Sequence, residues 1–274
     1  MNQRIPEPIR PAIQDYIALV NQQIPGLMKA FYVEGSIALG GFNEHFSDID
    51  FVALLNRQFT PTEFATLRNI HKIIGRSYPR WKMSGSYLQS DDLGRYNKVE
   101  ANSCYEGRLR PQGHFDWNWV GGWILKNHGI AIIGPEPQAL PVTIDWDHLS
   151  KTMRENLNSY WAGWTRRPDA FGEMLFDLGI QWSVLGVLRQ FYSFRENAIT
   201  TKMKAGEYAL TCVPSRWHRL IQEAIDIRSG RRSSTYRYRI VRTKSSTYQY
   251  RIVRTIEAVR FLKFIIQTCN ASFT

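Results

Sequence analysis

Two short stretches near the N-terminus carry residue types that handle phosphate. Gly35 and Ser36 follow an apolar run, and Asp48 comes twelve residues after Ser36, with Asp50 two positions further on. A glycine turn lets backbone N–H groups and a serine hydroxyl approach a phosphate. Two carboxylates two positions apart on a strand project from one face, where they can hold Mg²⁺ against phosphate oxygens. The spacing therefore predicts a site for Mg²⁺ and a nucleoside triphosphate, to which Ser47 adds a hydroxyl.

Short apolar strands and amphipathic helices must position these residues. The pattern predicts strands at 28–33, 49–55, 80–88 and 130–133, and helices at 11–24, 61–74 and 117–128. Thr60, Pro61 and Glu63 have the types and spacing of a capping box at a helix start. Residues 91–116 show little periodicity and are predicted to form a long loop.

The second half of the sequence has a different character. From about Asp145 strand signals vanish, and one helical stripe is predicted. Its members are Phe176, Ile180, Val184, Val187 and Phe191. Further helices are predicted at 201–212, 214–228 and 256–269. We expect an α+β fold, in which residues 1–140 form an α/β domain with a small mixed sheet and residues 141–274 an all-α helical bundle.

The Gly-Ser…Ser-Asp-x-Asp pattern resembles the nucleotidyltransferase superfamily related to DNA polymerase β, and the chain resembles the aminoglycoside nucleotidyltransferases, especially the streptomycin/spectinomycin adenylyltransferases. The resemblance implies a polymerase β-like domain followed by a helical domain that closes the site. It also implies an antibiotic-resistance enzyme that transfers AMP from ATP, with Mg²⁺, to a hydroxyl of an aminoglycoside or similar small cationic acceptor and releases pyrophosphate. In that scheme Asp48 and Asp50 are catalytic metal ligands, and Gly35, Ser36 and Ser47 bind the nucleotide.

In the helical half, Arg189 and Lys202 match a nucleotide-binding arginine and lysine of the family. Cations there would neutralise charge on the phosphates as pyrophosphate leaves. A cationic acceptor needs carboxylates and flat aromatic faces, and the residues that offer them are Trp161, Trp164, Glu173 and Asp177. Packing in the core or at a domain interface is the alternative role of the two tryptophans.

The chain departs from the family on the third strand. There the family has a glutamate that acts as general base, whereas Ser84 holds the corresponding position here. The candidate replacements are Glu100, Glu106, Asp116, Glu173 and Asp177, of which the last two are preferred. Alternatively, metal binding alone deprotonates the acceptor, or the protein binds nucleotide without efficient transfer.

The formal charge of +11 is concentrated in one segment. Residues 233–243 recur at 245–255 with a single change, and residues 231–255 hold eight Lys or Arg and no acid, so that removing them leaves +3. This duplicated insertion makes the basic composition weak evidence for nucleic acid, which is not an expected partner. A nucleic-acid binder that uses the repeat is nevertheless a third hypothesis.

The remaining features favour a reducing cytoplasm and small-molecule substrates. There are three cysteines, no N-terminal apolar leader and no long charge-free apolar stretch, so neither a disulfide framework nor a membrane span is expected. The main alternative function is a nucleotidyltransferase-fold protein that acts on or through a protein partner, as antitoxin-like members do. The long helical half favours the antibiotic-modifying type.

Overall fold

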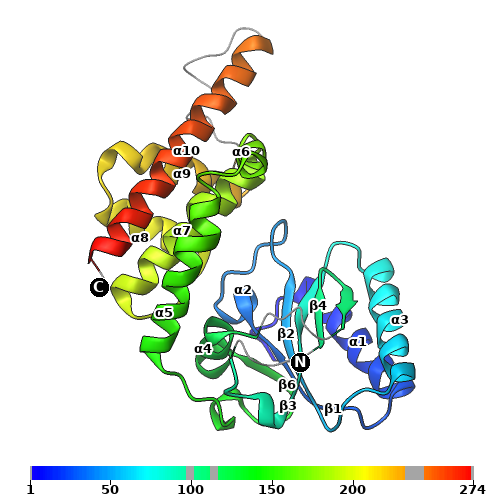
Figure 1. The fold of residues 1–274 in the computed structure, drawn as a ribbon. Coiled ribbons are helices and arrows are strands. Elements are labelled where there is room, and N and C mark those ends of the chain that lie inside the picture. The colour runs from blue at the N-terminus through cyan, green and yellow to red at the C-terminus, as the bar shows by residue number, and fades with distance from the viewer. Residues whose placement is uncertain (1, 97–101, 112–116, 232–243, 273–274) are drawn as a thin grey trace. The chain divides into compact units, whose positions relative to one another are not determined.

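The computed structural model describes residues 2–96, 102–111, 117–231 and 244–272 (Figure 1). The chain splits into two compact units, Met1–Asp145 and Trp146–Thr274. The sequence places the boundary between residues 140 and 141. Each unit has its own core and is described by itself.

A six-stranded mixed sheet forms the centre of the first unit. Its strands are β1 (Met28–Val33), β2 (Ile49–Leu55), β3 (Met83–Gln89), β4 (Asn102–Tyr105), β5 (Arg108–Arg110) and β6 (Ile130–Ile133). The order is β5-β4-β3-β2-β1-β6. Only β2 and β3 are parallel, and the other neighbours are antiparallel. With the helical second unit, this sheet confirms the expected α+β class.

Helices cover both faces of the sheet. The helices of this unit are η1 (Glu7–Ile9), α1 (Arg10–Gln23), α2 (Gly35–Ala38), α3 (Pro61–Ser77), η2 (Ser90–Asp92), α4 (Trp119–His128) and η3 (Pro137–Ala139). On one face, Tyr16 of α1 and His71 of α3 pack against Phe51 of β2. On the other, Leu125 of α4 joins a cluster that includes Val52. Figure 1 shows α1 and α3 together on one side of the strands.

The start of α3 confirms the predicted capping box. The Thr60 hydroxyl accepts the Glu63 backbone N–H at 3.2 Å, and the Glu63 carboxylate accepts the Thr60 N–H at 2.8 Å. Pro61 occupies the first turn, where no N–H is needed. The helix continues to Ser77, three residues beyond the predicted end at residue 74.

The predicted long loop at 91–116 is wrong in part. Within it, β4 and β5 form an antiparallel hairpin that extends the sheet beyond β3. The two strands have four and three residues, too few to show a periodicity of two in the sequence. Glu106 and Gly107 make the turn, both with positive φ.

The second unit is helical throughout its described residues. Its helices are α5 (Trp146–Asn156), η4 (Leu157–Trp161), α6 (Pro168–Met174), α7 (Asp177–Glu196), α8 (Lys202–Cys212), η5 (Ser215–Trp217), α9 (His218–Arg228) and α10 (Lys244–Ser272). Four members of the predicted stripe are buried in α7: Ile180, Val184, Val187 and Phe191. Phe176 is a correction, because it precedes α7 as its N-cap residue and is 59% exposed.

The second copy of the repeat is part of the core. Arg254 of α10 is 1% exposed and donates to Asp177 at 2.7 Å and to Glu223 at 3.2 Å. Tyr250 donates to the same Glu223 oxygen at 2.9 Å, and the Thr255 hydroxyl donates to a backbone carbonyl of α6. These bonds fasten α10 to α6, α7 and α9. The first copy, residues 233–243, lies outside the described residues.

No single helix among the described residues is long and apolar enough to cross a membrane. The pair Pro168–Met174 and Asp177–Glu196, bent by 108°, passes a test of length and composition only.

His71 makes the stability of the first unit depend on pH. Burial lowers its pKa from 6.5 to about 4, so the folded chain keeps the imidazole neutral while the unfolded chain protonates it below pH 6.5. Stability is therefore complete above pH 6.5 and falls as the pH drops toward 4, by about 2 kcal/mol from this group between pH 7.5 and 5.

Chemical denaturation of wild type, His71→Gln and His45→Gln at pH 7.5 and 5 tests this. We expect His45→Gln, which changes an exposed histidine, to keep the wild-type loss. His71→Gln should show a loss smaller by about 2 kcal/mol. Equal losses in all three proteins would contradict the assignment.

Candidate active site

Gly35 and Asp50 are in direct contact where β1 ends and β2 begins. The Glu34 backbone N–H donates to the Asp50 carbonyl at 2.9 Å, which joins the two strands at this point. Gly35 has φ +61°, and a Cβ atom there would lie 2.0 Å from the Asp50 carboxylate oxygen Oδ2. Any side chain at position 35 would displace that carboxylate. The glycine is therefore required twice, for its backbone conformation and for the space it leaves.

The loop between α2 and β2 brings the two serines together. The Ser36 hydroxyl donates to the Ser47 hydroxyl at 3.1 Å, and the Asn43 backbone N–H donates to the same Ser47 oxygen at 2.9 Å. Ser47 is 7% exposed. The structure thus places Gly35, Ser36, Ser47 and Asp50 in one small region.

Asp48 and Asp50 lie on either side of the first residue of β2. The strand begins at Ile49, so Asp48 precedes it by one position. Ile49 is completely buried, and its N–H donates to the Lys82 carbonyl at 2.7 Å, which fixes the strand's start. Both aspartates are partly buried.

The donor chemistry of this pair suits Mg²⁺. Mg²⁺ prefers oxygen ligands and is commonly held by one or two carboxylates, with phosphate oxygens and water completing the shell. Within the described ranges, no group of three or more His, Cys, Asp or Glu is arranged to hold a metal. Two carboxylates beside two hydroxyls therefore fit a cation that arrives with a nucleotide.

Ser84 stands beside Asp50 on the neighbouring parallel strand. Its hydroxyl accepts the backbone N–H of Glu106 at 3.0 Å, and the Glu106 carboxylate pairs with Lys82 at 3.2 Å. The β4–β5 turn thus brings an acid to the strand that lacks one. Of the other candidate bases, Glu100 and Asp116 lie outside the described residues.

The second unit presents Arg189 and Lys202 on α7 and at the start of α8. The Lys202 ammonium lies 3.7 Å from the centroid of the Trp182 ring, a cation–π contact. Trp182, 40% exposed, donates its indole N–H to the Tyr160 hydroxyl at 3.0 Å. Arg189 follows Trp182 by seven positions, which is about two helical turns, so both lie on one face of α7. Sequence reasoning missed Trp182, although an aromatic residue outside the apolar stripe is a usable signal.

Arg228 is a further cation that sequence reasoning missed. It is 4% exposed and donates to Gln181 at 3.1 Å. Burial, and then the charge of Arg189, lower the pKa of Arg228 to about 10. Two arginines within electrostatic reach of each other favour an anion nearby. No sequence signal joins positions 39 residues apart.

Of the four residues expected to bind the acceptor, the structure brings the two tryptophans together, with their ring centroids 6.4 Å apart, whereas the two acids have other surroundings. Trp161 is 4% exposed and packs on α7, where a Cβ at Gly186 would lie 2.1 Å from its ring. Trp164 is equally buried. Glu173 is exposed in α6, and Asp177 pairs with Arg254.

Comparisons with known proteins bear on the fold and on part of the second unit. Residues 151–247 match the family model described as the aminoglycoside adenylyltransferase C-terminal domain. Among solved structures, the chain is similar to spectinomycin adenyltransferase AAD(9) from Enterococcus faecialis, which was determined with ATP and spectinomycin. The TM-score is 0.64 at 12% identity, over 92% of this chain and 98% of that one. No curated protein matches the sequence at a significant level.

The two findings bear on different levels. The structural likeness shows a shared fold, and the family match identifies most of the second unit. The match to the aminoglycoside adenylyltransferase C-terminal domain covers most of the helical unit, and with the shared fold it confirms the resemblance found in the sequence and the expected enzyme class, a nucleotidyltransferase.

Proposed function

We propose that the protein transfers AMP from ATP to a hydroxyl of an aminoglycoside-type antibiotic or similar small cationic acceptor, with Mg²⁺, and releases pyrophosphate. The observation that carries the proposal is the contact between Gly35 and the Asp50 carboxylate, with the paired hydroxyls of Ser36 and Ser47 in the same region. The solved structure of AAD(9), a protein of the same fold, contains ATP and spectinomycin, which supports both substrate classes. We place the protein in the cytoplasm, a reducing compartment that contains ATP.

The described residues divide the work as follows. Ser36, Ser47 and the backbone at Gly35 bind phosphate oxygens, because their hydroxyl and N–H groups donate hydrogen bonds. Asp48 and Asp50 hold Mg²⁺, which when bound polarises the α-phosphate and lowers the pKa of the attacking hydroxyl.

Cations of the helical unit serve the leaving group. Arg189 and Lys202 neutralise the charge that builds on pyrophosphate as it departs. Arg228 lies within electrostatic reach of Arg189 and adds to the positive potential there. The Trp182 ring beneath the Lys202 ammonium holds that cation in place.

Glu106 is the proposed general base. Ser84 occupies the third-strand position beside Asp50 and binds the backbone of Glu106, so that a neighbouring turn supplies the missing carboxylate. Glu106 is exposed and hence open to an acceptor. Asp177, by contrast, is engaged by the buried Arg254, which argues for a structural role.

The family match in the helical unit favours this function over the antitoxin-like alternative, which requires only the first unit. A stable protein partner that co-purifies with the chain and abolishes transfer would reverse this preference.

The central test measures pyrophosphate release from Mg²⁺-ATP with a panel of aminoglycosides. We expect at least one acceptor to stimulate release, and Asp48→Asn and Asp50→Asn each to lower kcat/KM by about a thousandfold or more, because the carboxylate charge that holds the cation is lost. Chelation of Mg²⁺ should abolish release. The enzymatic proposal would be refuted if, for all acceptors tested, folded wild type released no more pyrophosphate than folded Asp48→Asn.

A pair of glycine variants separates site geometry from backbone strain. Gly35 and Gly40 both have positive φ, but a Cβ at Gly40 meets nothing within 4 Å. Each change to alanine should cost about 1 kcal/mol of stability from the backbone alone. We expect only Gly35→Ala to lose activity, by more than about tenfold, because it displaces the Asp50 carboxylate. Equal activity in the two folded variants would contradict this role of Gly35.

The base assignment is tested by the pH dependence of kcat. A carboxylate base loses activity when it is protonated, so wild-type kcat should fall on the acid side. We expect Glu106→Gln to lower kcat by about a hundredfold, with little change in KM, and to flatten that acid limb. Glu44→Gln removes an equally exposed, ion-paired acid of the same unit and should behave as wild type. An unchanged acid limb in Glu106→Gln would exclude it as the base.

A further inference from the structure

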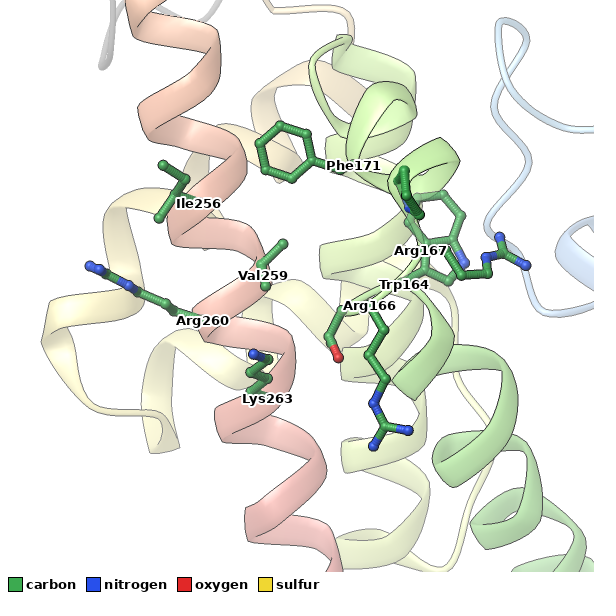
Figure 2. A pocket seen from close by; sticks show the side chains of 10 residues that line it. Trp164, Arg166, Arg167, Phe171, Ile256, Val259, Arg260 and Lys263 are labelled. Atoms are coloured by element: carbon green, nitrogen blue, oxygen red, sulfur yellow. The ribbon is translucent and has the colours of Figure 1, made fainter.

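A hollow of 420 Å³ lies within the helical unit, and neither Arg189 nor Lys202 is among the residues that line it. It is bounded by α10 on one side and by the turn leading into α6 on the other (Figure 2). Its charged lining residues are Arg166, Arg167, Arg260 and Lys263. No acidic residue lines the hollow.

The four cations are exposed and mostly lack carboxylate partners. Arg167 pairs with Asp169 at 3.4 Å, an exposed pair. For the other three, the described part of the chain contains no carboxylate within ion-pairing distance. Figure 2 shows Arg166 and Lys263 on facing sides of the opening. In Figure 2 the Arg167 and Arg260 side chains extend outward from the rim of the hollow. Like charges around one concave site create a positive potential that attracts anions.

Apolar and aromatic side chains form the rest of the lining. Phe171, Ile256 and Val259 contribute rings and methyl groups, and Trp164 adds a buried indole. In Figure 2 the Phe171 ring faces the space between α6 and α10. A flat ring beside several cations suits a ligand that joins aromatic bases to phosphates.

The lining continues into a second hollow along α10. This space, 430 Å³, shares Arg260 and Lys263 with the first and adds Arg216, Trp217 and Phe264. The Arg216 guanidinium lies 5.1 Å from the Trp217 centroid and 5.4 Å from that of Phe264. Cations therefore alternate with aromatic rings over two adjoining hollows. This lining offers more cations and rings than a single mononucleotide could contact.

We propose that this face of the helical unit, the Arg260 face, binds single-stranded nucleic acid, with RNA as the probe of choice. Its phosphates would meet Arg166, Arg260, Lys263 and Arg216, and a base would stack on Phe171. The concave lining favours a polymer strand over a flat anionic membrane. The proposal does not depend on the transferase activity.

The charge distribution revises an expectation from the sequence. Nucleic acid was not expected because the excess charge lies in residues 231–255. All the cations of the Arg260 face lie outside that segment. Helix α10 nevertheless begins within it, so that the basic segment continues directly into the Arg260 face.

The test is fluorescence anisotropy with a labelled oligouridine RNA of about 20 nucleotides, measured across a salt series. The variant Arg260→Gln/Lys263→Gln removes two cations of the face. The control Lys72→Gln/Lys151→Gln removes two exposed lysines elsewhere and lowers the formal charge equally. For single strands the salt slope changes by about 0.7 per phosphate contact, so the first variant should lower the slope by about 1.4, and the control by nothing.

We expect the Arg260/Lys263 variant to bind about tenfold more weakly or worse at moderate salt, and Phe171→Leu to bind several-fold more weakly through lost stacking. Equal weakening in the face and control variants would mean that binding follows net charge alone and would overturn the proposal. So would binding that both variants keep in full. Vesicles containing phosphatidylserine that bind through Arg260 and Lys263, while RNA does not bind, would replace nucleic acid by a lipid surface.

Discussion

The close approach of Gly35 to the Asp50 carboxylate is the constraint on which the candidate active site depends. Antiparallel pairing of β1 and β2 sets the end of one strand beside the start of the other, and the bond from the Glu34 N–H to the Asp50 carbonyl fixes the distance. The carboxylate then fills the volume that a Cβ would take. Ser36 follows Gly35 directly, and its bond to Ser47 closes the loop that ends at Asp48. One missing side chain therefore allows both halves of the motif to meet.

Much of this arrangement was predictable because local patterns determine it. The strands at 28–33, 49–55 and 130–133 have the predicted bounds, and the Thr60 capping box is a four-residue signal that needs no tertiary contact. The β4–β5 hairpin was not predictable in this way. Its strands are stabilised by pairing with β3, so its existence depends on a sheet that the local sequence does not describe. Arg228 could not be predicted for the same reason. Only the tertiary structure shows that this arginine is buried within electrostatic reach of Arg189.

The repeat shows why chemical identity alone does not assign a structural role. Its two copies offer nearly the same side chains, yet the core contains Tyr250, Arg254 and Thr255 of the second copy. A buried arginine is tolerated only where carboxylates and carbonyls surround it, and Asp177, Glu223 and the Leu175 carbonyl do so here. Asp177 is therefore one half of an ion pair. Removing its carboxylate would leave the buried Arg254 charge with less compensation. The sequence makes Asp177 a candidate general base and acceptor-binding residue. The ion pair with Arg254 would have to be broken for either role, which costs free energy.

Electrostatics constrains the proposed reaction in a further way. A chain of formal charge +11 attracts ATP from a distance and repels a polycationic acceptor. At physiological ionic strength, screening limits this long-range effect to roughly 8 Å, so an acceptor must be recognised by charges close to where it binds. Residues 231–255 carry eight positive charges and no acid, so they cannot supply the carboxylates that this recognition needs. In the proposed reaction, Glu106, an exposed acid paired with Lys82, would serve both as a negative charge for the cationic acceptor and as the base for its hydroxyl. Ser84 at the strand position and Glu106 in the adjoining turn would then act together in acceptor recognition.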